Sequence, residues 1–426
     1  MQLNGHRFVR GALAAAACTA LGQASAGEPI DAWQVDSALL SYNEEGRVSV
    51  IEPVVYATRQ VSEDLSYTLR AVHDTMTGAT PNGAAPSSET QTITSASGTS
   101  STVAAGELPM KTFSDQRVAI GLDMTRNLSR LEKRLTSFNL SGETDYFSVG
   151  GSLAHTRDSS DRMRTYTRGL GLSLDVVAPA LGAPPGMQSI TVTNTGASGE
   201  GEGEDDGEGF HGNLKLSADA LLGITQVLSR RSLLQSNIAF SVSGGYLSDP
   251  YKMVSLVDGS GLPTDYVWEQ RPGMRGALSF YTKWVYHLPH DVLHLSYRWF
   301  HDSWGIQSHT ADLTYHITMG GRLYLEPHAR FYTQTAADFY YSSLPDWQSL
   351  PSYASADYRL AAMDSTTVGV KLGMKSGQDS EFSIRMEKMI QRGIDPQAGA
   401  IGTQSSVNLY PGLNATVIQF SFSTKF

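Results

Sequence analysis

The final twelve residues, Ala415-Thr-Val-Ile-Gln-Phe-Ser-Phe-Ser-Thr-Lys-Phe426, alternate between apolar and polar side chains. In an extended strand, one face would carry Ile418, Phe420, Phe422 and Phe426. The other face would carry Gln419, Ser421, Ser423 and Lys425. A strand of a membrane barrel needs this period of two, because one face meets lipid and the other meets the lumen. We therefore predict a transmembrane barrel strand whose Phe420, Phe422 and Phe426 form a C-terminal insertion signal, with an amphipathic strand of a soluble sandwich as the alternative.

The same alternation recurs along most of the chain. Clear apolar faces are formed by Val118, Ile120, Leu122 and Met124, by Leu170, Leu172, Leu174 and Val176, and by Ile238, Phe240 and Val242. Counting such segments between Trp33 and Phe426 gives about sixteen strands, within a range of roughly fourteen to eighteen, each near the length that a tilted spanning strand needs. The predicted fold is all-β, a closed antiparallel transmembrane β-barrel.

The lengths of the connections test this prediction independently. In such barrels the periplasmic turns are short and the extracellular loops are long, so with both termini in the periplasm long loops follow only odd-numbered strands. By our strand count, the long connections follow strands three, seven, nine, thirteen and fifteen, at about 75–112, 179–211, 248–271, 335–357 and 392–410. A soluble sandwich or propeller has no reason to obey this parity.

The N-terminal segment indicates the compartment. His6, Arg7 and Arg10 precede an apolar run over 11–21, and the small residues Ala24-Ser25-Ala26 follow it. This pattern is typical of a secretory signal peptide over 1–26, which leaves 27–426 as a single outer-membrane barrel domain, reached by Sec export through the periplasm. The single cysteine, Cys18, lies within the apolar run, so the mature chain would have no thiol chemistry. A lipidated Cys18 is the weaker alternative.

The charge balance excludes one class of partner. The chain carries 32 basic and 42 acidic residues, a formal charge of −10. Removal of Arg7 and Arg10 with the signal peptide makes it −12, which argues against a nucleic acid partner. The expected partners are outer-membrane lipid, lipopolysaccharide and the barrel assembly machinery. A homo-oligomer is compatible with this architecture, but strand number does not fix assembly.

Several longer segments resemble a known bacterial family, the one catalogued as domain of unknown function 3570. They are Trp33-Gln-Val-Asp-Ser-Ala-Leu-Leu-Ser-Tyr-Asn-Glu44, Asp74-Thr-Met-Thr-Gly-Ala-Thr-Pro-Asn-Gly-Ala84, Gly106-Glu-Leu-Pro-Met110, Gly245-Tyr-Leu-Ser-Asp-Pro-Tyr-Lys252, Tyr297-Arg298 with Asp302 and Trp304-Gly-Ile306, and Ala336-Ala-Asp-Phe-Tyr340. The resemblance covers most of the mature chain and implies an outer-membrane barrel of a diderm bacterium. The resemblance implies no particular activity, and no catalytic residue can be assigned from it.

Charged and polar side chains stand opposite the apolar residues between about 291 and 334. The candidates for a lumen constriction are His294, Arg298, Asp302, Asp312, His316, Arg322, Glu326, His328 and Arg330. In a porin, opposed acids and bases would set a transverse field that selects solutes by charge. The alternative is that these groups pair with one another and fill the lumen.

Histidines in this band also raise an enzymatic or metal-binding interpretation. His294 and Ser296 share a face, and His316 and His328 are expected on neighbouring strands. No Gly-x-Ser-x-Gly or His-Glu-x-x-His signature accompanies them. We therefore expect no catalytic residue, no resident metal and no cofactor, and we rank an outer-membrane hydrolase third among the functions.

Two loop segments have unusual compositions. An acidic segment over 200–209 contains Glu200, Glu202, Glu204, Asp205, Asp206 and Glu208. These carboxylates could hold calcium as a surface cation site, or form a solvated loop that meets the cations bridging lipopolysaccharide. The stretch from Thr75 to Glu107 is too polar to bury a core of its own, so it either caps the mouth or folds inward. The function we expect is a porin-like channel for small hydrophilic solutes, and the alternative is a non-conducting anchor or binding scaffold.

Overall fold

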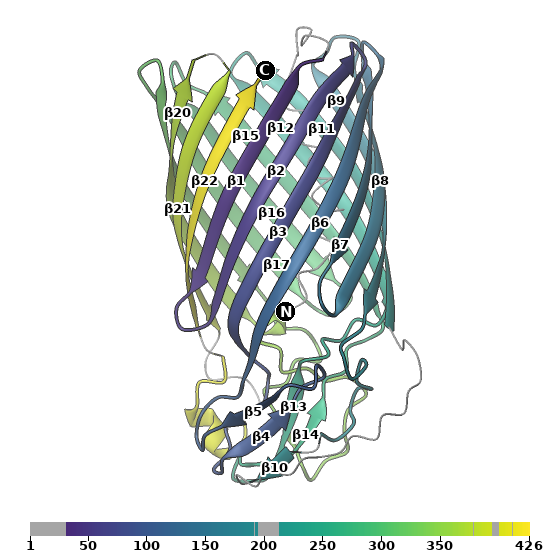
Figure 1. Cartoon of the computed structure of the whole chain (residues 1–426), viewed down its shortest axis with the longest axis vertical. Coiled ribbons are helices and arrows are strands. Elements are labelled where there is room, and N and C mark those ends of the chain that lie inside the picture. The colour runs from purple at the N-terminus through teal and green to yellow at the C-terminus, as the bar shows by residue number, and fades with distance from the viewer. Residues whose placement is uncertain (1–30, 191, 195–212, 378, 394–399, 411) are drawn as a thin grey trace.

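The protein is a closed barrel of sixteen antiparallel strands, seen in a computed structural model (Figure 1). The structure describes all residues except 1–30, 191, 195–212, 378, 394–399 and 411. The predicted signal peptide and the acidic segment over 200–209 lie outside the described residues. Around the barrel the strands are β1 (Trp33–Glu44), β2 (Val48–Ser62), β3 (Leu65–Pro81), β6 (Met110–Ser129), β7 (Glu132–Gly142), β8 (Tyr146–Asp158), β9 (Arg164–Val177), β11 (Asn213–Ser229), β12 (Ser232–Gly245), β15 (Met274–His287), β16 (Val292–Asp302), β17 (Gln307–Met319), β18 (Leu323–Gln334), β20 (Met363–Ser376), β21 (Ser380–Gly393) and β22 (Leu413–Lys425). The predicted fold class and the strand count are confirmed.

The last strand closes the barrel against the first. β22 pairs with β1 in antiparallel register from Gln34 opposite Lys425 to Glu44 opposite Ala415. The pairing ends in a reciprocal pair of backbone hydrogen bonds between Trp33 and Phe426, at 2.8 and 2.9 Å. No barrel strand is therefore left with an unpaired edge.

Apolar side chains cover the outer wall. Leu170 is 65% exposed and Phe420 is 54% exposed, although both belong to central parts of the sheet. Phe422 packs against Phe382 of the neighbouring strand, with ring centroids 4.6 Å apart. Such exposure suits a surface that faces lipid rather than water. Within the described residues, no helix is long and apolar enough to cross a membrane.

The two ends of the barrel differ. One end, near the C-terminus, has short turns such as 63–64, 130–131 and 230–231. The opposite end has the long connections, which follow the third, seventh, ninth, thirteenth and fifteenth barrel strands as predicted. One predicted boundary is wrong: the first long loop covers 82–109 rather than 75–112, because Thr75 to Pro81 continue to pair with Met110 to Gln116. We call the two ends the turn end and the loop end.

The long loops fold together into a body beyond the loop end (Figure 1). It contains a sheet of β10 (Val192–Asn194), β4 (Gln91–Thr94) and β5 (Ser100–Val103), a sheet of β14 (Pro263–Trp268), β13 (Met253–Val257) and β19 (Leu344–Pro345), and the 3-10 turns η1 (Tyr358–Leu360) and η2 (Gly402–Ser406). One of its cores joins Ala84, Ile93, Ile190, Met253 and Tyr266 from three loops. We call the described loop residues 82–109, 178–194, 246–273, 335–362 and 400–410 the cap.

The opposed faces of β17 lead to a prediction. Leu313 faces outward at 41% exposure, whereas its neighbour Thr314 faces the lumen. We expect Leu313→Arg to lower the free energy of unfolding in lipid vesicles by about 2–4 kcal/mol, because a cation then faces hydrocarbon. Thr314→Arg should change it by less than about 1 kcal/mol, because its side chain enters the wet lumen. Urea titration of both refolded variants measures the difference, and equal losses would contradict the assignment of faces.

Candidate functional site

The charged band predicted on β16 to β18 lies largely on the inner wall. His294 and Arg298 on β16, Asp312 and His316 on β17, and Glu326, His328 and Arg330 on β18 all alternate with outward residues such as Leu295, Leu313 and Phe331. Arg322 is an exception, because it lies in the exposed turn before β18 begins at Leu323. Its predicted place on the lumen wall was wrong, since the alternation was extended past the start of the strand.

Asp302 has a different place from its neighbours in the band. It is the last residue of β16, at the loop end, and its side chain is fully buried. One carboxylate oxygen accepts hydrogen bonds from the backbone N–H groups of Trp304 and Ile306, each at 3.0 Å, and the other accepts one from Arg275 Nε at 2.8 Å. Asp302 therefore fixes the turn between β16 and β17 rather than lining a constriction.

The charges of the band pair with one another. His328 lies between two carboxylates, with Nε2 2.9 Å from Asp312 and Nδ1 2.9 Å from Glu387. Asp312 also accepts a hydrogen bond from Arg330 Nε at 2.9 Å. Beside them, Glu326 lies 2.8 Å from His316 and 3.7 Å from Lys371. This part of the wall is thus a network of mixed charges that pair with one another.

Further pairs lie on other parts of the inner wall, outside the predicted band. Asp74 on β3 is fully buried and pairs with Arg117 on β6. Arg70 Nε lies 2.9 Å from Asp123, and Lys215 lies 3.4 Å from Asp175. The sequence carried the signal for some of these, because Arg117 and Asp123 alternate with the apolar Val118, Ile120 and Leu122.

Water can reach part of this inner wall. The side chains of Arg330 and Arg385 are 54% and 43% exposed, although both point into the barrel. Side chains fill the interior of an eight-stranded barrel, whereas barrels of about sixteen strands enclose an aqueous space. The lumen is therefore wet where it is not covered by other parts of the chain.

The residues considered for catalysis do not form a catalytic arrangement. Among the described residues, Nδ1 of His294 is buried and has no hydrogen-bond partner, so it does not bond Ser296. His316 and His328 are each held by carboxylates rather than facing a shared centre. Within the described part of the chain, three potential metal ligands come together only at Asp115, Glu143 and Asp145 near the loop end. A nucleophile with an oriented base is not assembled on this wall.

The cap contains a buried cluster of ions. We call these six residues the cap cluster: Asp249, Lys252, Glu269, Arg271, Asp357 and Arg359. Arg271 lies 2.7 Å from Glu269 and 2.8 Å from Asp357. Arg359 lies 2.5 Å from Asp249 and also pairs with Asp357. Three acids and three bases balance, which is the condition under which burial of so many charges is tolerated.

Burial and charge act in opposite directions on the acids of this cluster. Burial raises the pKa of the Glu269 carboxyl above its usual range. Burial also acts on Asp249 and Asp357, but the cations of Arg359 and Lys252 outweigh it and hold the pKa of both carboxyls below the usual range. Asp249 and Asp357 are therefore charged at neutral pH and pair with Arg359 as full ions.

The cap cluster ties together ends of strands that lie far apart around the barrel. Lys252, in the loop after β12, donates a hydrogen bond to the carbonyl of Pro81 at the end of β3. β3 and β12 are the third and ninth strands in the ring of sixteen. The loop that carries Lys252 therefore reaches across the mouth to contact β3. The ring of Tyr358 lies 5.4 Å from Lys252 and 4.9 Å from Arg47 in the β1–β2 turn. Of the two arrangements left open for the stretch after Thr75, the structure has the one that caps the mouth.

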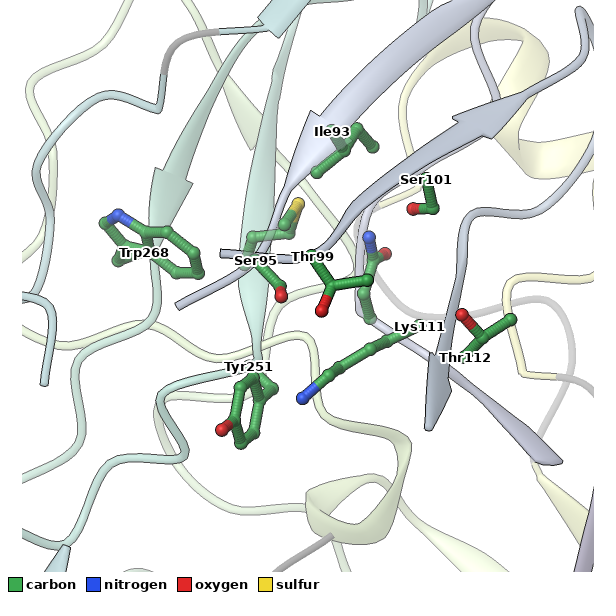
Figure 2. Close-up of a pocket in the computed structure, with 10 residues that line it drawn as sticks. Ile93, Ser95, Thr99, Ser101, Lys111, Thr112, Tyr251 and Trp268 are labelled. Carbon is green, nitrogen blue, oxygen red and sulfur yellow. The ribbon is translucent and has the colours of Figure 1, made fainter. Parts of the chain in front are cut away.

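The cap interior is packed where its loops meet the barrel wall. Figure 2 shows Lys111 of β6 pointing toward Tyr251 beneath the strand that carries Ile93. The Tyr251 hydroxyl in turn donates to Asp145 in the β7–β8 turn. The pocket that these residues line has a volume of about 10 Å³, which holds at most one water molecule. It is a packing defect rather than a ligand site.

Solved structures share the barrel architecture at low sequence identity. They include the CymD monoaromatic hydrocarbon channel, at 7% identity, a TM-score of 0.41 and coverage of 98% of this chain and 93% of that one. They also include OccK1 (OpdK) of Pseudomonas aeruginosa, at 7% identity, a TM-score of 0.40 and coverage of 93% and 98%. No curated protein matches the chain. A family model does match it over residues 10–424, so the chain belongs to the family described as "Protein of unknown function (DUF3570)".

Proposed function

We propose that this protein is a porin-like channel of the outer membrane that passes small hydrophilic solutes, with a cap across its external mouth. The observation that carries the proposal is the exposed charge of the inner wall, at Arg330 and Arg385, inside a closed ring of sixteen strands. A scaffold that only anchors itself in lipid has no need of a wet and charged interior. Mixed charge along such a wall selects solutes by charge and dipole.

The cap supports a second candidate, a non-conducting barrel that serves as an anchor or binding scaffold. Bonds such as the one from Lys252 to Pro81 cross the mouth and narrow any path to the lumen. The two candidates differ in what the cap does. In the channel it is a gate or filter, whereas in the scaffold it is the functional surface itself.

The charged wall leads to a prediction for ion selectivity. Arg330→Gln removes a half-exposed cation from the inner wall, so the reversal potential in a salt gradient should shift toward cation selectivity by several millivolts. Arg322→Gln is the matched control, because it makes the same chemical change in an exposed turn outside β18. Single-channel recording in planar lipid bilayers measures both. Equal reversal potentials in wild type and Arg330→Gln would contradict a conducting path along this wall.

The cap cluster leads to a prediction for gating. Arg359→Ala leaves Asp249 and Asp357 buried without their common cation, at a cost of about 3–5 kcal/mol to the closed cap. We expect a higher mean conductance and faster proteolysis within the cap, while heat-modifiable gel migration shows that the barrel remains folded. Arg230→Ala, in a short turn at the opposite end, is the control. A variant whose cap is cleaved but which carries no current would favour the scaffold.

A further inference from the structure

A recess of about 220 Å³ lies in the inner wall, in the half nearer the turn end. Its floor follows from the register, which places small residues side by side on three neighbouring strands. Ser383, Ser421 and Ala38 are consecutive partners on β21, β22 and β1, and all three line the recess. Longer side chains stand beside this row, Arg385 and Gln419 toward the loop end and Glu381 and Asp36 toward the turn end, so the wall is hollowed along it.

The two long sides of the recess carry opposite charges. Lys371 and Arg385 are direct partners on β20 and β21, one step toward the loop end from the floor. Glu381 on β21 and Asp36 on β1 stand one step toward the turn end. Glu381 and Arg385 are four residues apart on one strand, which places their Cα atoms about 13 Å from each other. All four side chains line the recess.

One tyrosine, Tyr56, lines the recess, and a second, Tyr324, stands beside it. The ring of Tyr324 lies directly over Gly373, where a Cβ atom would come within 2.0 Å of the ring. Its hydroxyl bonds Glu381, and Lys371 lies 5.0 Å from its ring centroid, so it joins the acidic side to the basic side. Tyr56 on β2 is the direct partner of Asp36. The recess therefore has a basic side, an acidic side and an aromatic side chain at its β2 edge.

The charges around the recess are not fully used by each other. Among the described residues Arg385 makes one ion pair, with Glu387 at 3.9 Å, and its side chain is 43% exposed. Lys371 lies 3.7 Å from Glu326, which is a loose ion pair. Asp36 accepts a hydrogen bond from Gln34 at 3.0 Å and lies beside no cation at ion-pair distance among the described residues. Donors on one side and carboxylates on the other remain available to a solute.

We propose that this recess binds zwitterionic solutes, with a carboxylate against Arg385 and Lys371 and an ammonium group against Glu381 and Asp36. A solute with both charges satisfies both sides, whereas an anion or a cation alone leaves one side repulsive or unpaired. Short peptides have this chemistry, and an extended tripeptide spans about 10 Å. The proposal rests on the channel function, since it names the class of solute that the lumen would take.

The test is calorimetric titration of the refolded, detergent-solubilised mature chain with triglycine. N-acetyltriglycine, which lacks the ammonium group, and triglycinamide, which lacks the carboxylate, are the single-charge controls. We expect triglycine to bind at least about tenfold more tightly than either. Arg385→Gln and Glu381→Gln should each weaken its binding by about tenfold, and Ser421→Leu, which fills the floor, should abolish it. Arg322→Gln, in the turn outside the wall, should bind as wild type does.

Three results would overturn the proposal: no binding of triglycine, equal binding of the single-charge controls, or an unchanged affinity in both Arg385→Gln and Ser421→Leu. Heat-modifiable migration verifies that each variant has folded. Calorimetry measures binding whether or not the protein conducts ions. Its result therefore tests the recess independently of the channel function. A protein that conducts in bilayers but does not bind triglycine refutes the recess alone, and one that binds triglycine but does not conduct refutes the channel alone.

Discussion

The pairing of β22 with β1 is the constraint on which the rest of the molecule depends. In hydrocarbon an unpaired backbone N–H or C=O costs several kcal/mol, so a sheet is tolerated there only when it has no edge. Eleven aligned residue pairs join the first strand to the last, and the bonds between Trp33 and Phe426 end the row. Closure also fixes which side chains face inward. The closure of the ring therefore determines where the lumen, the cap and the recess lie.

The inner wall and the cap both contain charged side chains inside the protein, and they accommodate these charges in two different ways. Along the wall, acids and bases on adjacent strands pair at the edge of an aqueous space, as with Asp312, His328 and Glu387. In the cap, four of the six ions are buried, Arg359 is about one-third exposed, and the charges balance within the cluster. The first arrangement leaves charge available to solutes. The second arrangement uses its charges within the cluster, and it holds loops from different parts of the ring in one position.

Much of the barrel could be predicted from the sequence, because its rules are local. Alternation gave the strands, and the parity of the long connections separated a membrane barrel from a soluble sheet. Contacts between loops could not be predicted, since nothing in the order of residues joins Lys252 to Pro81 or Asp249 to Arg359. The recess escaped prediction for a related reason. Its floor of Ser383, Ser421 and Ala38 is a row across three strands, which can be recognised only when the register is known.

The cap has a consequence for the order of assembly. Its hydrogen bond between Lys252 and Pro81 joins residues 171 positions apart, and the strands that carry its loops are distributed around the ring. Contacts of such long separation form late, after the scaffold that positions them. A ring closed one strand short, or with one strand slipped, would move Pro81 relative to Lys252 and break the hydrogen bond between them. We therefore expect the complete cap to form only after the barrel has closed in the correct register.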